Sequence, residues 1–354
     1  MLRLPALESI SLGVMPTVKS NGITLAYERF HPEPDTEPVP ANPSHGMRGW
    51  ARRIGRRLNP SSEIREPVKQ QPEPLLLIMG LGGQLIDWPR GFIDELLTRG
   101  FDVIAFDNRD AGASELLDLP VPSIVELAVE GVLARQEKVP YLIKDMADDA
   151  ADLLEALDIG SAHVVGASMG GMIAQSMAIH HPLKVRSLTS IMSMPGDRFS
   201  GRVATSLALR LTTMIPPPDE RDPDAVVDYI SEIQNLIAGP RSDEASTADR
   251  ARLAVERGFS FDGLRRQLAA VAAGPDRTSD LQKLRVPTLV IHGDKDRLIT
   301  VGGGQATARA VPGSVLLTFP DMGHDLPPTR WSHMATAISG VATEARARPS
   351  TFRI

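Results

Sequence analysis

Short runs of aliphatic residues, separated by helical patterns, constrain this chain of 354 residues more than any other feature. The runs occupy residues 75–79, 102–107, 163–167, 186–192, 287–293 and 314–320. They are continuously apolar, as is typical of parallel strands covered on both faces. Between them, segments such as 142–159 place Met146, Ala150 and Leu154 on one helical face. The sequence therefore predicts an α/β fold: a mostly parallel sheet with helices on both faces, which the alternating segment 20–30 enters first as an edge strand.

Two segments interrupt this pattern. Residues 31–74 contain nine prolines in 44 positions, so we expect a partly disordered insert. Residues 197–282 contain helical patterns without a good strand, yet they lie between two predicted core strands. An inserted helical cap is the simplest interpretation. The core then consists of residues 1–30, 75–196 and 283–354.

The residues Gly166-Ala167-Ser168-Met169-Gly170 follow one aliphatic run and precede a helical pattern. They match G-x-S-x-G, the sharp strand-to-helix turn that exposes a nucleophilic serine. Glycines on both sides remove side chains that would collide with the strained turn. The helix start favours negative charge near the Met169 N–H. The alternatives are a turn that merely needs glycines, or one that binds phosphate.

A serine nucleophile needs a base and a carboxylate from later loops at the same edge of the sheet. Both occur in the order Ser, Asp, His: Asp296 follows the fifth aliphatic run and His324 follows the sixth. Asp294 is the alternative acid, but we expect it to bond its own turn. His292 lies at a strand end, where a structural hydrogen bond is expected. Carboxyl-end loops of an open parallel sheet meet at one crevice, so these side chains are expected to converge.

With these motifs the chain, from about residue 20 onward and without the proline-rich insert, resembles the α/β-hydrolase superfamily. The segments "LLLIMGLGGQLIDWP", "FDNRDAGAS" and "HVVGASMGGMIAQ" are similar to those of serine esterases of the aclacinomycin methylesterase type. The resemblance implies that Ser168 is the nucleophile, Asp296 the orienting acid and His324 the general base. It also implies that no metal or organic cofactor is needed.

The glycine-rich loop after residue 79 does not fit a dinucleotide fingerprint, because Leu85 stands where the third glycine is required. In the resembled family this loop carries the second oxyanion donor, which implies that the backbone N–H groups of Leu81 and Met169 hold the oxyanion. Many relatives have His-Gly here, whereas this chain has Met79-Gly80. The side-chain brace of the loop is therefore absent, and the sequence does not indicate its replacement.

The segment 107–114, "DNRDAGAS", lies in a further loop after a strand. Arg109 and Asp110 could be read as catalytic groups there. We favour a structural role in which they brace neighbouring loops.

The overall composition limits the classes of partner. The net charge is −6, so no global positive field would recruit nucleic acid. The absence of cysteine excludes disulfides and thiolate metal sites. No run reaches the roughly 20 apolar residues that cross a bilayer, and Pro5, Glu8 and Ser9 interrupt the start in a way unlike a signal peptide. We therefore expect a cytoplasmic protein.

One part of the insert suggests a surface contact. Residues 47–58 contain five arginines, no acid, and four apolar residues on one helical face: Met47, Trp50, Ile54 and Leu58. A basic amphipathic helix would make a weak contact with an anionic membrane. Two glycines weaken that helix, so a solvated, disordered segment is the favoured alternative.

The leading hypothesis is a serine carboxylesterase that forms an acyl-enzyme on a small or medium hydrophobic ester, with the cap shaping its pocket. Carbon–carbon bond hydrolysis or acyl transfer on the same triad is the enzymatic alternative. A ligand receptor on a hydrolase scaffold is the alternative without catalysis. The sequence does not indicate the oligomeric state.

Overall fold

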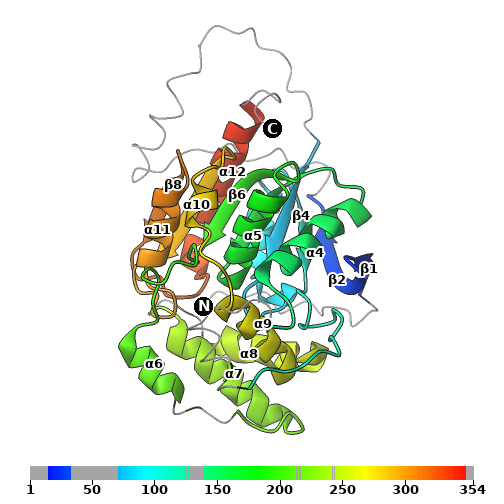
Figure 1. The fold of residues 1–354 in the computed structure, drawn as a ribbon, viewed down its shortest axis with the longest axis vertical. Helices are drawn as coiled ribbons and strands as arrows, with labels where there is room; N and C mark the ends of the chain where they lie inside the picture. The colour runs from blue at the N-terminus through cyan, green and yellow to red at the C-terminus, as the bar shows by residue number, and fades with distance from the viewer. Residues whose placement is uncertain are drawn as a thin grey trace, which may run out of the picture.

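The computed structural model shows one twisted sheet between two layers of helices (Figure 1). It describes residues 15–32, 71–123, 126, 139–212, 214, 217–240, 242 and 244–347. Within these residues the strand order is β1-β2-β4-β3-β5-β6-β7-β8, and all pairs from β4 to β8 are parallel. The strands are β1 Thr17–Ser20, β2 Ile23–Phe30, β3 Glu73–Ile78, β4 Phe101–Phe106, β5 Ala162–Ala167, β6 Val185–Ile191, β7 Thr288–Gly293 and β8 Val315–Phe319. The predicted fold class is confirmed.

Helices cover both faces of this sheet and also lie beyond the carboxyl ends of its strands. They are α2 Arg90–Leu97, α4 Ile143–Ala156, α5 Met169–His180, α6 Thr205–Thr212, α7 Pro223–Ile237, α8 Glu244–Gly258, α9 Phe261–Ala272, α10 Thr278–Leu281, α11 Gly302–Ala310 and α12 Trp331–Ala347. Short 3-10 helices, η2 Leu85–Asp87 and η4 Pro328–Arg330, lie in loops. Helices α2 and α12 pack together on one face, and α4 and α5 pack on the other. Among the described residues, no helix is long and apolar enough to cross a membrane.

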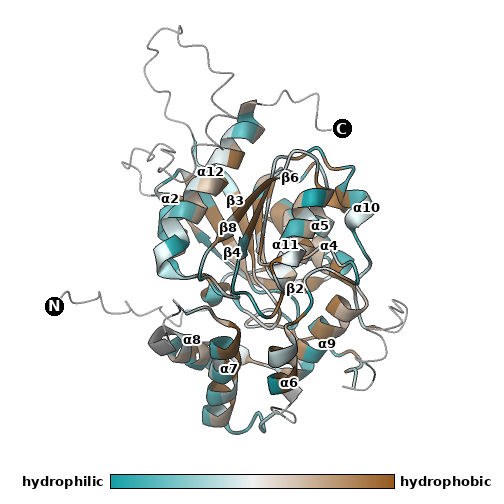
Figure 2. Ribbon diagram, turned by 90° about the vertical axis from the view of Figure 1, so that its left-hand side faces the viewer, coloured by the Kyte–Doolittle hydropathy of each residue, from teal (hydrophilic) through white to brown (hydrophobic). Residues whose placement is uncertain are grey.

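The central strands are buried on both sides, which explains their continuous apolar runs. Leu75 and Leu77 of β3 join the apolar cluster beneath α2 and α12. Leu76 and Ile78 point the opposite way and join the cluster beneath α4 and α5. Figure 2 shows the same arrangement as brown strands between the outer helices. Each face thus has its own core, and the carboxyl ends of the strands are left free to carry loops.

The N-terminal edge of the sheet differs from the prediction. Residues 20–30 were expected to form one edge strand, but β1 pairs antiparallel on the outer side of β2 and takes the edge. The turn between them is Asn21-Gly22, with φ values of 47° and 82°. Asn-Gly is favoured in two-residue hairpin turns because both residues tolerate positive φ. The segment that was read as one strand therefore contains a hairpin turn.

Helices α6 to α9 lie beyond the carboxyl ends of the strands, at the lower end of Figure 1. Asp222 caps α7 by accepting a hydrogen bond from the Ala225 N–H at 3.1 Å, and Ser260 caps α9 at the Gly263 N–H at 3.2 Å. Helix α10 instead packs beside α5 and α11. Within 197–282 the described residues contain helices and no strand. The division into core and cap stays a prediction, and most of the insert 31–74, with the segment 47–58, lies outside the described residues.

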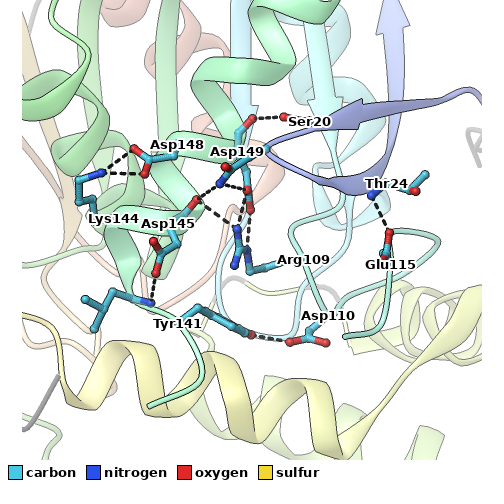
Figure 3. A network of polar contacts seen from close by, with 12 residues as sticks. Ser20, Thr24, Arg109, Asp110, Glu115, Tyr141, Lys144, Asp145, Asp148 and Asp149 are labelled. Atoms are coloured by element: carbon cyan, nitrogen blue, oxygen red, sulfur yellow. Dashed lines mark hydrogen bonds and ion pairs between the residues drawn. The ribbon is translucent and has the colours of Figure 1, made fainter. Parts of the chain in front are cut away.

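The loop after β4 ties the sheet to α4. Arg109 donates two hydrogen bonds of 2.6 Å to the carboxylate of Asp149 (Figure 3). Asn21 donates a third to that carboxylate at 2.9 Å. The side chains of the ion pair are 8% and 2% exposed. The Arg109 guanidinium also lies 4.9 Å from the centre of the Tyr141 ring. These contacts match the bracing role predicted for Arg109.

Replacing Arg109 with methionine should lower the free energy of unfolding by about 3–5 kcal/mol, because Asp149 would be left buried without its main partner. Urea denaturation measures this loss. The matched control is Lys144→Met, which removes a more exposed 2.7 Å ion pair to Asp148 on the same helix and should cost at most about 0.5 kcal/mol. Equal losses in the two variants would contradict the assignment.

Candidate active site

Ser168 occupies a strained turn between β5 and α5. Its φ is 57° and its ψ is −121°, a region that residues with a Cβ atom rarely occupy. The Ser168 N–H donates to the Ile191 carbonyl at 2.9 Å, which ties the turn to the end of β6. Such strain persists only where the surroundings enforce it. Here it directs a hydroxyl out of the sheet at the start of a helix.

The flanking glycines allow close backbone contacts. A Cβ on Gly166 would lie 2.0 Å from the Gly170 carbonyl oxygen, as expected for a collision within the turn. A Cβ on Gly170 would lie 2.0 Å from the Ile78 carbonyl oxygen instead. Gly170 therefore allows close contact with strand β3. The prediction that it relieves a collision within the serine turn is wrong. Helix α5 can approach the sheet at this point because both side chains are missing.

The three residues that sequence order selected lie in one hydrogen-bonded row. His324 Nε2 is 2.9 Å from Ser168 Oγ, and His324 Nδ1 is 2.7 Å from Asp296 Oδ2. They come from the loops after β5, β7 and β8, which meet at the carboxyl edge of the sheet. The other oxygen of Asp296 accepts the Leu298 and Ile299 N–H groups at 3.0 and 2.9 Å. This carboxylate is thus fixed before it orients the imidazole.

The charge on Asp296 is stabilised from two sides. Burial alone would raise the pKa of its carboxyl, but the imidazoles of His324 and His292 together hold that pKa below its ordinary value. His292 Nε2 lies 3.4 Å from Asp296 Oδ2 and 2.7 Å from the Ile299 carbonyl oxygen. The structural hydrogen bond predicted for His292 is present. The sequence did not reveal that the same ring also borders the triad acid.

The neighbouring acids hold the loops together. Asp294 accepts the Asp321 N–H at 2.9 Å, so it bonds the loop after β8 rather than its own turn as predicted. Asp325 accepts the N–H groups of Gly323 and Gly239 at 2.9 and 3.2 Å. The second of these bonds reaches the residues that follow α7. The His324 loop is therefore held by both the sheet and the helices above it.

The loop after β3 lies against the serine turn. A Cβ on Gly80 would be 2.9 Å from the Ser168 Cβ, so Leu81 directly follows a residue in contact with the nucleophile. Within the described residues, neither the Leu81 N–H nor the Met169 N–H has an intramolecular acceptor. Both predicted oxyanion donors are available, and they come from the two loops that flank Ser168.

Other contacts replace the histidine side chain that is absent from the start of the loop after β3. The Gly82 N–H donates to Gln267 Oε1 at 2.8 Å, and Gln267 Nε2 donates to the Arg109 carbonyl at 2.7 Å. At the start of the loop, Asn108 donates to the Met79 carbonyl at 2.9 Å. Sequence reasoning missed Gln267 because 185 residues separate it from Gly82. Positions 263, 266, 267 and 270 form one buried face of α9, but their residue types make no apolar stripe that would mark this face in the sequence.

Two buried ion pairs connect helices α8 and α9 with the loop after β4. Arg257 of α8 donates to Asp107 at 2.8 Å, and Arg266 of α9 donates to both oxygens of Asp110 at 2.7 and 2.9 Å. Both carboxylate side chains are fully buried. Burial raises the pKa of Asp107, although Arg257 opposes that effect. Tyr141 also donates a 2.7 Å hydrogen bond to Asp110, as Figure 3 shows.

The described residues contain no group of three or more histidine, aspartate or glutamate side chains placed to hold a metal ion. The expectation of a cofactor-independent site stays a prediction.

Comparison with known proteins identifies relatives. A family model described as alpha/beta hydrolase fold matches residues 73–329. Rhodomycin D methylesterase DnrP from Streptomyces peucetius is 26% identical over 286 residues, which covers 75% of this chain and 89% of the relative. Rhodomycin D methylesterase DauP from Streptomyces sp. strain C5 is 27% identical over 290 residues with the same coverage. These matches confirm the predicted resemblance to esterases of the methylesterase type.

Solved structures share the fold. A meta-cleavage product hydrolase from Pseudomonas fluorescens IP01 superposes with a TM-score of 0.63 at 17% identity, covering 93% of this chain and 98% of its own. A thermophilic esterase from Thermogutta terrifontis superposes with a TM-score of 0.57 at 20% identity, covering 94% and 97%. At these identities the similarity concerns the fold alone.

Replacing Gly170 with alanine should destabilise the protein by about 3 kcal/mol or more, because a methyl group cannot share space with the Ile78 carbonyl. Gly160→Ala is the matched control, since a Cβ there meets nothing within 4 Å, and it should change stability by less than about 0.5 kcal/mol. Thermal and urea unfolding measure both. A stable, fully active Gly170→Ala protein would show that the close approach is unimportant.

The lowered pKa of Asp296 has a consequence for stability. A carboxyl whose pKa is lowered by folding stabilises the protein above its unfolded pKa, and this contribution disappears as the pH falls through the folded value. The stability difference between wild type and Asp296→Asn should therefore be larger at about pH 6 than at about pH 3. Urea unfolding at the two pH values measures it, and a difference that grows toward acid would contradict the prediction.

Proposed function

The chain belongs to the α/β-hydrolase fold family, and on that premise we propose that it is a serine hydrolase that cleaves a carboxylic ester through an acyl-enzyme. The main support is the hydrogen-bonded row from Ser168 Oγ through His324 to Asp296, with distances of 2.9 and 2.7 Å. A hydroxyl so placed can lose its proton to the imidazole as it attacks a carbonyl carbon.

Each group has a defined role in the proposed reaction. His324 takes the Ser168 proton, and the serine oxygen attacks the ester carbonyl. The N–H groups of Leu81 and Met169 stabilise the oxyanion of the tetrahedral intermediate. The protonated imidazole then gives its proton to the departing alcohol, and Asp296 holds the ring in the required tautomer. His324 then takes a proton from a water molecule, which attacks the acyl-enzyme and releases the acid and the free serine.

The relatives support an ester as the substrate. Two are named as methylesterases of rhodomycin D, and each match covers most of both chains. For this chain we propose a small or medium hydrophobic ester, because the apolar cap residue Leu264 packs directly on the loop beside Ser168. The proposal needs no cofactor and places the reaction in the cytoplasm.

Ser168→Ala should lower ester turnover by at least about 10⁴-fold and abolish labelling by a fluorophosphonate probe, because the attacking oxygen is gone. Ser176→Ala is the matched control on the same helix. It removes another buried hydroxyl and should keep both activities. Turnover of a panel of p-nitrophenyl esters, with intact-mass analysis of the labelled protein, measures the effect.

Labelling and turnover that persist in Ser168→Ala would contradict the serine mechanism. Labelling without turnover of any ester would favour carbon–carbon bond hydrolysis or acyl transfer on the same triad, which product analysis would then separate. A wild-type chain with neither property would support the receptor alternative.

A further inference from the structure

We propose that Gln267, on cap helix α9, is a positioning residue that holds the loop carrying the oxyanion donor Leu81. The inference rests on the proposed function, because the Leu81 N–H matters only if an oxyanion forms beside Ser168. It extends that function by making catalytic geometry depend on a cap side chain far from Ser168 in the chain.

The held loop is a tight turn of defined type. The Gly83 N–H donates to the Gly80 carbonyl at 3.1 Å, which closes a four-residue turn over residues 80–83. Gly82 has a φ of 66°, whereas Leu81 is not among the residues with positive φ. A turn that is positive only at its third residue is a type II turn. The closing bond fixes the peptide that contains the Leu81 N–H, since its carbonyl is the acceptor.

The central peptide of that turn is held from the cap. Its N–H belongs to Gly82 and donates to Gln267 Oε1 at 2.8 Å. Type I and type II turns differ chiefly by rotation of this peptide, so a fixed acceptor for its N–H selects one of them. Without the acceptor, this partly buried N–H would be unpaired, and the loop would rotate to find another partner.

Gln267 is itself immobilised. Its side chain is fully buried, and its amide nitrogen donates to the Arg109 carbonyl at 2.7 Å. The preceding residue, Arg266, forms the buried ion pair with Asp110. Leu264, one turn earlier on α9, occupies the space beside Gly82 where a Cβ would otherwise lie. The acceptor is therefore presented from a rigid helix, which a positioning role requires.

The test compares two substitutions of Gln267 by the rate at which a fluorophosphonate labels Ser168. This reaction depends on the oxyanion donors, and it can be measured without knowing the natural ester. Gln267→Met keeps the length and removes both hydrogen bonds. We expect it to slow labelling by roughly 10- to 100-fold, less than the 100- to 1,000-fold typical of losing a donor outright. On an ester that turns over, kcat should fall while KM changes little.

Gln267→Glu gives a readout that a purely structural role would not produce. The protonated carboxyl can accept from Gly82 and donate to Arg109, whereas the carboxylate places a negative oxygen against the Arg109 carbonyl. Burial raises the pKa of such a carboxyl. The labelling rate relative to wild type should therefore be near unity at about pH 5 and fall toward pH 8, while the ratio for Gln267→Met should stay constant.

Gln84→Met is the matched control. Its amide donates to the Ala254 and Gly258 carbonyls at 2.8 and 3.2 Å, so it also joins this region to a cap helix, without contacting the Gly82 N–H. It should lower the melting temperature as Gln267→Met does, yet label at close to the wild-type rate.

The outcomes separate the two proposals. Wild-type protein that is not labelled at Ser168 contradicts the proposed function and this inference with it. Labelled wild type with an equal rate in Gln267→Met overturns the inference alone. If Gln267→Met does not fold, Gln267→Glu decides: a labelling ratio that is constant from about pH 5 to pH 8 overturns the inference.

Discussion

The close approach of helix α5 to strand β3 is the constraint on which the site depends. Gly170 lies where a single methyl group would overlap the Ile78 carbonyl, and Gly80 lies against the Ser168 side chain. These contacts let the serine turn and the glycine-rich loop share one small space. The strained backbone of Ser168 is stabilised there by the sheet on one side and the helix start on the other.

Much of this arrangement could be predicted because it follows from local rules. The central strands β3 to β7 were recognisable as apolar runs, since burial on both faces removes any alternation. The row of Ser168, His324 and Asp296 followed from chain order and from the convergence of carboxyl-end loops. The sequence predicts Gly170 as relief for the strained serine turn, whereas the structure shows that it makes room for the Ile78 carbonyl of strand β3. The two glycines of G-x-S-x-G thus satisfy different requirements: the first is needed by the turn itself and the second by the neighbouring strand.

Other features depend on contacts between distant segments, and the sequence alone could not pair them. Nothing near Gly82 in the chain indicates Gln267 as its partner, and the burial of Arg266 and Gln267 on α9 is visible only in the structure. The Asn21-Gly22 turn is a different case. Its signal is local, and it was overlooked because the strand pattern continued across it. The Gly82–Gln267 contact depends on the folded chain, whereas the Asn21-Gly22 turn could have been predicted from its two residues.

The helices above the sheet act as part of the site's framework. Arg257 and Arg266 neutralise Asp107 and Asp110, which have no exposure to solvent. Buried pairs of this kind add little net stability, but they strongly penalise the loss of either partner. Replacing these helices with those of another hydrolase would therefore leave two buried carboxylates without their positively charged partners. Exchange of helices α8 and α9 therefore also requires changes at Asp107 and Asp110 in the loop after β4.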